Sequence, residues 1–237
     1  MITSKDNDQI KKIIKLQTKK YRDQFQSFLI YGEHAINEAL KQGYDLDIYT
    51  SNPNRSGTLI SDALMKQLSL TESPMEMVAI AKMNAPKPYS NQILMLDDVQ
   101  DPGNLGTLIR SAVGFGFKTI ITSLNTVDFY NDKTIRATQG NLFYANLIKT
   151  SLVESILNLK AQGYTIYVTA LGVKATELKQ IQKSQKCVLV LGNEGAGVSQ
   201  ALINLADQLV YIHTQDIESL NVAMAGSIIM YEWQVSS

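Results

Sequence analysis

Short apolar runs alternate with amphipathic segments along most of the chain. In the first third, the runs at 28–32, 46–51 and 77–83 have the length and composition of strands. Helical spacing predicts helices over 33–41 and 59–68, and it predicts an earlier helix that carries Ile10, Ile13, Ile14 and Tyr21. This alternation favours a small α/β domain over residues 1–83.

The alternation resumes after residues 84–90, which contain Pro86 and Pro88 and which we interpret as an interdomain linker. Nearly continuous apolar runs follow at 93–99, 118–123, 165–171, 187–193 and 208–213. Such runs are typical of a parallel sheet that is covered on both faces. We therefore predict a second α/β domain over residues 91–237. Ligands of such sheets bind beyond the carboxyl ends of the strands.

The segment from Glu218 to Trp233 has a polar start and then becomes almost wholly apolar. Its pattern predicts a helix that is buried on every side, and it is too short to span a bilayer. Small residues recur within it, namely Ala223, Ala225, Gly226 and Ser227. We expect other backbone to pass close to them. Gly226 costs roughly 1 kcal/mol relative to alanine inside a helix, so a packing reason is expected there.

Composition places the chain with soluble globular proteins, since 45% of its 237 residues are hydrophobic and 19% are charged. Without a signal-peptide pattern or a run of transmembrane length, we expect a cytoplasmic protein with no membrane partner. The formal net charge is zero, yet residues 1–30 carry seven Lys or Arg against three acids, a net of +4. Such a segment can contact RNA phosphates or form a solvated helix face, and charge alone favours the second.

Residues that bind metals or act as nucleophiles are scarce. His34 and His213 are the two histidines and Cys187 is the single cysteine, so no metal-ligand spacing exists and no metal site is expected. Cys187 lies in an apolar run and is expected to be buried. We expect His34 to pack or to cap a helix, and His213 is a functional candidate only through its place beside a polar loop. The G-x-S-x-G pattern of serine hydrolases does not occur.

Three loops follow apolar strands at the expected ligand-binding edge. Residues 97–106 contain a tight turn and Asn104, which could cap the next helix ahead of Arg110, although an ordinary capped turn explains them equally well. Residues 191–199 contain three glycines, which favours binding, but they match neither the Walker loop nor the dinucleotide fingerprint. Residues 212–221 place Ser219 and Asn221 at a helix start, where backbone donors are unpaired.

In order and spacing, DPGNLGTLIR, LVLGNEGAGVS and ESLNVA resemble the three signature motifs of the SpoU/TrmH branch of the SPOUT RNA methyltransferases. KTIRATQGNLF is similar to the family's R-A-S-x-G-A-x-F pattern through Arg136 and Gly140, with Thr138 and Asn141 as departures. At the front, FLIYGEHAINEAL and LSLTESPMEMVAIAK resemble a ribosomal-protein-like substrate-binding domain that many ribosomal RNA members carry. That domain favours ribosomal RNA over transfer RNA as the substrate.

The resemblance implies methyl transfer from S-adenosyl-L-methionine to a ribose 2′-hydroxyl. It also implies a SPOUT domain with a deep trefoil knot, an exception among folds, and a homodimer with composite active sites. By the same resemblance, the catalytic residues are Asn104, Arg110, Glu194, Ser219 and Asn221. The cofactor pocket would be lined by Leu191, Gly192, Asn193, Gly197, Ile212, Ser219 and Leu220. RNA contacts are expected at Lys12, Lys19, Arg22 and Arg136.

The chemistry of the guanidinium group restricts the role that Arg110 can have. A guanidinium group with a pKa above about 12 is a poor base. We therefore expect Arg110 to anchor phosphate or to stabilise a developing alkoxide, and to be oriented by Asn104, Glu194 and Ser219. Family members often read I-P-x-x-G-x-x-E-S-L-N before the last helix. Residues 212–217 lack that proline and glycine and are one residue shorter, which would reshape the adenine pocket.

Other functions stay open at this point. A non-catalytic RNA-binding or assembly protein on the same scaffold is suggested by the altered third loop, and a transfer RNA methyltransferase by the shared catalytic motifs. A nucleotide-dependent oxidoreductase is suggested only by the parallel sheet and the glycine loops, without a fingerprint.

Overall fold

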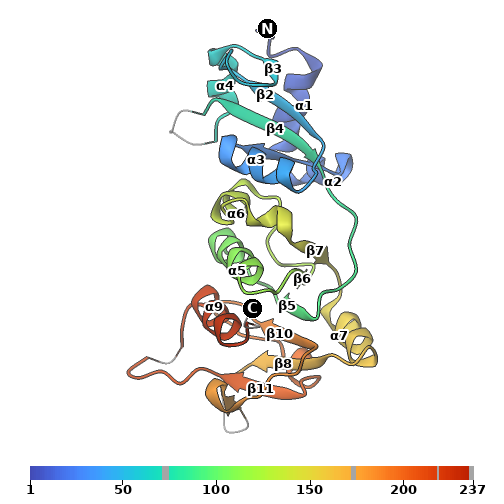
Figure 1. Ribbon diagram of the computed structural model, residues 1–237, viewed down its shortest axis with the longest axis vertical. Coiled ribbons are helices and arrows are strands. Elements are labelled where there is room, and N and C mark those ends of the chain that lie inside the picture. The colour runs from blue at the N-terminus through green and yellow to red at the C-terminus, as the bar shows by residue number, and fades with distance from the viewer. Residues whose placement is uncertain (71–74, 172–174, 218, 235–237) are drawn as a thin grey trace. The chain divides into compact units, whose positions relative to one another are not determined.

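The computed structural model describes residues 1–70, 75–171, 175–217 and 219–234 (Figure 1). Its contacts divide the chain into two compact units. Unit 1 comprises residues 1–85 and 130–143, and unit 2 comprises residues 86–129 and 144–237. The sequence had placed residues 130–143 in the C-terminal domain, whereas their contacts place them in unit 1.

Unit 1 is built on a four-stranded sheet with the strand order β1-β4-β2-β3. The strands are β1 (Ser27–Tyr31), β2 (Leu46–Thr50), β3 (Thr58–Leu59) and β4 (Met77–Lys82), with β4 antiparallel to β1 and β2. The helices are α1 (Asp8–Leu16), α2 (Lys19–Phe25), α3 (Glu33–Lys41), α4 (Asp62–Leu68) and α6 (Asp132–Ala137), and the 3-10 turn η1 (Asn141–Tyr144) follows α6. A small N-terminal α/β region is therefore present, as predicted.

The first predicted helix is in fact two helices. Thr18 has an extended backbone, with φ −106° and ψ 142°, and it separates α1 from α2. Ile10 and Ile13 are fully buried in the core of unit 1, whereas Ile14 is 45% exposed. The apolar spacing therefore identified Ile10 and Ile13 correctly as residues of the buried side of α1, but it also included Ile14, which is exposed.

The buried side chain of Arg22 caps the C-terminal end of α1. Its side chain is only 6% exposed, and its Nη1 atom donates to the carbonyls of Leu16 and Gln17 at 3.1 and 3.0 Å. The last carbonyls of a helix lack partners within the helix, so these bonds offset the cost of burying the charge. The prediction that Arg22 contacts RNA is therefore wrong.

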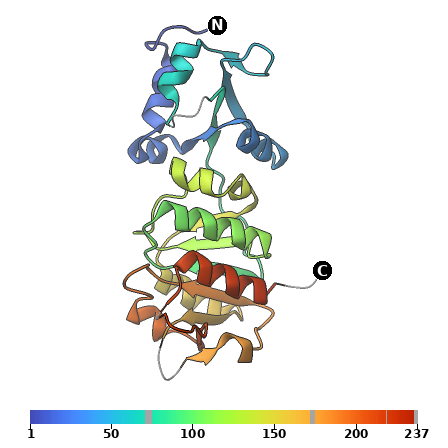
Figure 2. The same ribbon diagram turned by 90° about the vertical axis from the view of Figure 1, so that its left-hand side faces the viewer.

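Unit 2 contains a seven-stranded sheet in which every neighbouring pair is parallel (Figure 2). In spatial order, the strands are β7 (Asn146–Lys149), β6 (Thr119–Thr122), β5 (Gln92–Leu96), β10 (Cys187–Leu191), β8 (Thr165–Thr169), β11 (Gln208–Tyr211) and β9 (Thr176–Glu177). The predicted parallel sheet is confirmed. The sequence analysis missed the short strands β7 and β9, which carry no long apolar run.

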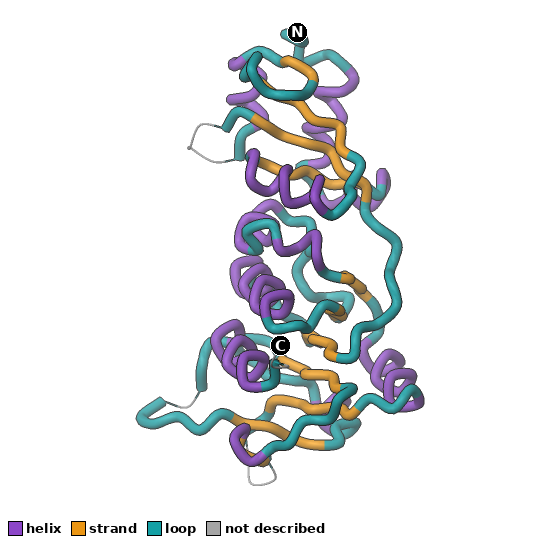
Figure 3. The backbone as a smooth tube through the Cα atoms, in the orientation of Figure 1, coloured by secondary structure: helices purple, strands orange, loops and turns teal. Residues whose placement is uncertain are grey.

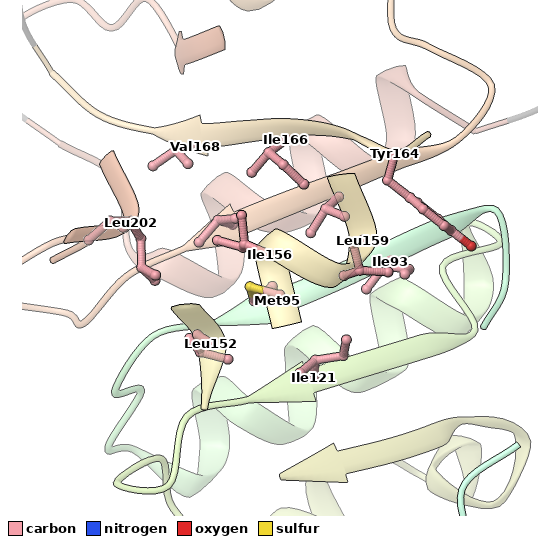
Figure 4. Close-up of a cluster of buried hydrophobic side chains, with 13 residues drawn as sticks. Ile93, Met95, Ile121, Leu152, Ile156, Leu159, Tyr164, Ile166, Val168 and Leu202 are labelled. Carbon is pink, nitrogen blue, oxygen red and sulfur yellow. The ribbon is translucent and has the colours of Figure 1, made fainter. Parts of the chain in front are cut away.

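Helices cover both faces of this sheet (Figure 3). The helices of unit 2 are α5 (Pro102–Gly114), α7 (Leu152–Ala161), α8 (Gln200–Ile203) and α9 (Val222–Glu232), and the 3-10 turn η2 (Leu178–Gln180) follows β9. On one face, Met95 and Val188 join Ile156 of α7 and Leu202 of α8 in a buried cluster (Figure 4). The opposite face carries α5 and α9, which pack against each other.

Cys187 starts the central strand β10 and is fully buried. Burial raises the pKa of its thiol to about 11, although Lys183 opposes that shift. The thiol is therefore protonated at neutral pH and acts as a small apolar group, as the sequence indicated.

Gly226 has a clear packing role in α9. A Cβ atom at this position would lie 2.5 Å from Leu108 Cδ2 and 2.5 Å from Leu191 Cδ1. Side chains of α5 and β10, rather than other backbone, therefore explain this small residue. The knot implied by the resemblance stays a prediction.

The prediction that α9 is buried on every side is wrong. Met224 is 58% exposed, Ile228 is 38% exposed and Tyr231 is 57% exposed. These residues recur at helical spacing and form one exposed apolar stripe on α9. Glu218, the first residue of the predicted segment, lies outside the described residues, and the helix itself begins at Val222.

We predict that Gly226→Ala destabilises the protein by about 1–3 kcal/mol, because the added methyl group overpacks the contact with Leu108 and Leu191. The measurement is the free energy of unfolding in urea. Gly114→Ala is the matched control, since Gly114 also lies in a helix and a Cβ atom there would meet nothing within 4 Å. Equal stability of the two variants would show that Gly226 is not needed for packing.

Candidate active site

Three polar loops meet at one edge of the unit 2 sheet. Because β5, β10 and β11 lie in one parallel sheet, the loops that follow them leave from the same edge. The first two loops are joined directly, since Asp97 Oδ2 accepts a hydrogen bond from Ser199 N at 2.8 Å. The Asp97 amide also donates to the carbonyl of Leu191 at 2.8 Å. This edge is therefore a rigid platform for the polar side chains that follow.

The helix α5 begins with a different cap from the one predicted. Asp101, not Asn104, is the N-cap residue, and its side chain accepts from Asn104 N at 2.8 Å. Pro102 takes the first helical turn, where a missing N–H costs nothing. The side chain of Asn104 is therefore available for contacts outside its own helix.

Glu194 gathers donors from the first loop. Its carboxylate accepts from Asn104 Nδ2 at 3.0 Å, from Asp101 N at 3.2 Å and from Gln100 N at 3.3 Å. Partial burial alone raises the pKa of Glu194, but these hydrogen bonds outweigh it and hold the pKa below the ordinary value of 4.5. Glu194 is therefore ionised at neutral pH and acts as an acceptor, not as an acid.

Asn104 carries the contact onward to the third loop. Its Oδ1 atom accepts from Asn221 Nδ2 at 3.1 Å. Asn221 in turn caps α9, because its Oδ1 atom accepts from the amides of Ala223 and Met224 at 2.9 and 3.3 Å. One chain of side-chain contacts, Glu194–Asn104–Asn221, thus joins the three loops. Asn221 therefore has two structural roles, because it caps α9 and connects that helix to the first loop.

The glycine loop after β10 is closed by its own main chain. Asn193 and Gly197 exchange two backbone hydrogen bonds of 3.0 Å, and Gly197 has φ 70°, which favours glycine. A Cβ atom on Gly192 would lie 2.1 Å from the carbonyl carbon of Gly197, so a larger residue would open the loop. Asn193 Nδ2 donates to the carbonyl of Asp98 at 2.9 Å and so ties this loop to the first.

A cavity of about 430 Å³ lies against these loops. The structure brings every predicted cofactor-binding residue to its wall, namely Leu191, Gly192, Asn193, Gly197, Ile212, Ser219 and Leu220. Glu194 also lines it, which places one end of the three-loop network on the cavity. The sequence analysis missed Thr169, Ala170 and Leu171, which also line the wall. Thr169 ends β8 and the other two follow it, so the rule that ligands bind beyond strand ends could have identified them.

The altered lead-in to α9 makes its turn without glycine. Asp216 has φ 61°, a left-handed conformation that aspartate tolerates. Thr214 Oγ1 donates to the carbonyl of Ile217 at 2.9 Å. Ile212 and Thr214 line the cavity, so this segment still contributes to its wall. His213 beside them is exposed.

Arg110 does not join the network of its own chain. Its side chain is exposed on α5, and it has no hydrogen-bond or ion-pair partner among the residues that the structure describes. Within one chain Asn104 and Glu194 bond to each other, and the expectation that they and Ser219 orient Arg110 stays a prediction. Arg110 lies about one and two-thirds turns beyond Asn104, which places it on another face of the helix.

The predicted RNA-contacting residues all lie in unit 1. Lys12 is half-buried on α1. Lys19 pairs with Asp23 at 2.5 Å, and Arg136 pairs with Asp132 at 2.9 Å, in both cases on an exposed helix face. His34, which was expected to pack or cap, lies 3.3 Å from the carbonyl of Gln139 through Nε2.

Two negative findings apply to the described part of the chain. No group of three His, Cys, Asp or Glu residues is arranged there to hold a metal ion. None of its helices combines the length and the apolar character that a membrane crossing requires.

Comparison with known proteins identifies the class. Residues 91–231 match the model of the SpoU rRNA Methylase family, and residues 7–79 match an MRM3-like substrate binding domain. The chain belongs to the SpoU rRNA methylase family of RNA methyltransferases, as its motifs indicated. One relative is the 23S rRNA (guanosine(2553)-2'-O)-methyltransferase RlmP of Bacillus subtilis (strain 168), which is 36% identical over 97% of both chains.

Solved structures agree over nearly the whole chain. The AdoMet-bound rRNA methyltransferase from Sinorhizobium meliloti superposes with a TM-score of 0.86 at 29% identity, and the match covers 98% of this chain and 95% of that one. The SpoU methyltransferase AviRb from Streptomyces viridochromogenes, solved with AdoMet, gives a TM-score of 0.85 at 23% identity over 95% and 96% of the two chains. The second likeness supports the fold alone.

We predict that Glu194→Gln weakens the three-loop network, because the new amide points a donor at groups that are themselves donors. The unfolding free energy should fall by about 1 kcal/mol at pH 7, since the carboxylate is solvent-exposed. The pKa of Glu194 is depressed in the folded state, so its contribution is complete above pH 4.5 and is lost as pH falls through the folded value.

The measurement is the unfolding free energy of the wild-type and Glu194→Gln proteins between pH 3 and pH 8. Glu154→Gln, at an exposed glutamate on α7, is the comparison variant, because it removes the same charge outside the three-loop network. A difference between wild type and Glu194→Gln that grows toward low pH would contradict the assigned sign.

Proposed function

We propose that the protein transfers a methyl group from S-adenosyl-L-methionine to a ribose 2′-hydroxyl of ribosomal RNA. The observation that carries this proposal is the Glu194–Asn104–Asn221 network, which joins the three signature loops beside one cavity. The near full-length similarity to a 23S rRNA 2'-O-methyltransferase supports the same activity.

The cavity fits the cofactor in size and in chemistry. Its volume of about 430 Å³ lies within the range of small-ligand pockets. Leu191, Val210 and Ile229 give it apolar walls for a purine or a thioether chain, while the glycine loop offers main-chain donors and acceptors. Bound there, S-adenosyl-L-methionine supplies an electrophilic methyl group. The chain's own task is to hold the ribose hydroxyl in line with it.

The polar residues of the site position the reacting groups, and the proton that the ribose hydroxyl loses passes to solvent water. Glu194 is ionised and already accepts three hydrogen bonds, so it fixes Asn104 and the first loop. Ser219 is exposed at the cavity wall, where its hydroxyl can meet the cofactor or the ribose. Arg110 keeps its full donor set for an RNA phosphate or for a developing alkoxide.

We infer that the active unit is a homodimer formed through the apolar stripe on α9. Met224, Ile228 and Tyr231 are exposed on one helix face, and Phe115 packs against Tyr231 with ring centroids 5.7 Å apart. A continuous exposed apolar surface of this kind marks an association site. A partner on this face would also explain why the α9 sequence reads as buried on every side. Arg110, exposed on the neighbouring helix α5, would then serve the partner's site.

Unit 1 is proposed to hold the RNA. Its match to a substrate binding domain supports this role. The basic helices α1 and α2 present Lys12 and Lys19, and the ammonium groups of Lys15 and Lys20 lie 5.6 and 5.7 Å from the ring centroid of Tyr21. Cations beside an aromatic ring suit phosphate and base contacts. Arg136 on α6 is a further proposed contact, and a ribosomal RNA substrate implies a cytoplasmic location.

The proposed activity predicts that the wild-type protein binds S-adenosyl-L-methionine in calorimetry. A map of 2′-O-methyl groups in ribosomal RNA should lose one position when the gene is deleted. Re-expression of the wild-type protein should restore that position, and Arg110→Ala should fail to restore it. An unchanged map together with no cofactor binding would refute the proposal. A transfer RNA target would appear as a lost position in the transfer RNA map instead.

The proposed dimer predicts complementation between two inactive variants. Arg110→Ala removes the arginine, and Gly192→Ala forces the glycine loop open, because the added Cβ atom would lie 2.1 Å from the carbonyl carbon of Gly197, and so disrupts the cavity wall. If Arg110 acts on the partner's site, a mixed dimer regains one intact site and about half of wild-type activity per mixed dimer. If it acts within its own chain, the mixture stays inactive. Thermal unfolding should first show that both variants are folded.

The stripe itself is tested by Tyr231→Glu, which should yield monomers in sedimentation velocity. Leu157→Glu on α7 introduces the same charge at a residue of similar exposure, 53% against 57%, and should remain dimeric.

A further inference from the structure

Leu124 is exposed at the same sheet edge as the site. It follows β6 by two residues and is 67% exposed. Among the described large apolar side chains beyond Met1, only Leu171 is more exposed, at 69%, and Leu171 follows β8 by two residues and lines the cofactor cavity. Two exposed leucines thus follow the strands on either side of β5 and β10. Leu171 lines the cofactor cavity, whereas Leu124 has no assigned role.

The turn that carries Leu124 is held unusually firmly. Asp98 Oδ1 accepts from Ser123 Oγ at 2.6 Å, and Asp98 Oδ2 accepts from Asn125 Nδ2 at 3.3 Å. The main chain adds bonds from Ser123 N to Leu96 O at 3.0 Å and from Thr126 N to Ser123 O at 3.3 Å. Asp98 itself has φ 56°, a left-handed conformation that this network holds in place.

The same turn is coupled to the catalytic network through Gln100. The side chain of Gln100 donates from Nε2 to the carbonyl of Asn125 at 3.0 Å. The backbone amide of Gln100 donates to Glu194 Oε2 at 3.3 Å. One residue therefore separates the Leu124 turn from the carboxylate that orders the three loops. An exposed leucine on such a turn loses little conformational entropy when it contacts a ligand.

We propose that Leu124 is an RNA-contacting residue that packs against an unstacked base beside the target ribose. This inference rests on the methyltransferase function proposed above. Proteins that read RNA in a sequence-specific way splay bases out of the stack and replace their stacking with side chains, and apolar wedges serve this purpose in nucleic-acid complexes. The side chains of Ser123 and Asn125 are hydrogen-bonded to Asp98, so Leu124 is the side chain that the turn presents to RNA.

The test compares wild type, Leu124→Ala, Leu124→Met and Leu157→Ala. Leu157 is the matched control, because it is a 53% exposed leucine on α7 in the same unit. The substrate is ribosomal RNA from a strain that lacks the gene, and initial methyl-transfer rates are measured at saturating S-adenosyl-L-methionine. We expect kcat/KM for RNA to fall about tenfold in Leu124→Ala, from the loss of a buried leucine contact. Leu124→Met and Leu157→Ala should stay within about threefold of wild type.

Two further readouts separate RNA contact from a structural role. Calorimetry should give the same affinity for S-adenosyl-L-methionine in Leu124→Ala and wild type, because Leu124 does not line the cavity. Chemical probing of the RNA should show a base beside the target that becomes reactive with wild-type protein and stays protected with Leu124→Ala.

Three results would contradict the proposed role of Leu124. Equal kcat/KM in Leu124→Ala and Leu157→Ala would overturn the inference while leaving the proposed function intact. A change of oligomeric state in Leu124→Ala would overturn it in favour of a contact with a second copy of the chain. Absence of methyl transfer by the wild-type protein would refute the proposed function, and the inference with it.

Discussion

The candidate site depends on one ionised carboxylate. Glu194 sits on the glycine loop after β10, yet all three of its donors come from the loop after β5. Through Asn104 the same contact reaches Asn221, which also starts α9. A single anion therefore sets the spacing of three segments that are separated by up to 117 positions in the chain. Removing this carboxylate would leave two backbone donors of the loop after β5 without their acceptor.

Much of unit 2 could be predicted from hydrophobic patterning. Long apolar runs identified the parallel sheet, because strands buried on both faces need them. The short strands β7 and β9 were missed, since their half-buried residues give no such signal. The candidate site followed from motif resemblance, which identified the residues around the cavity. Resemblance could not show what each residue bonds to. Asp101 took the cap expected of Asn104, because its position before Pro102 suits an extended residue.

Two errors share one physical cause. Arg22 was expected to meet RNA, and α9 was expected to be buried all round. Both expectations rest on residue type, whereas the outcome depends on what lies opposite each side chain. Arg22 finds two helix-end carbonyls within its own unit, so its charge is used internally. The stripe on α9 stays exposed in the described part of the chain, although Tyr231 contacts Phe115, and the proposed dimer would cover it. Composition along a segment cannot distinguish burial within a chain from burial between chains.

The order of the cavity walls along the chain has a consequence for biosynthesis. The cavity draws residues from Thr169 to Ile229, and its last wall is α9. A growing chain therefore lacks both the Asn221 contact and the Ile229 wall until α9 has been made. Because a ligand stabilises only a state that can bind it, the cofactor can favour only the finished fold. In a cell, the cofactor concentration would then affect the stability of completed molecules only. It would leave the earlier folding steps unaffected.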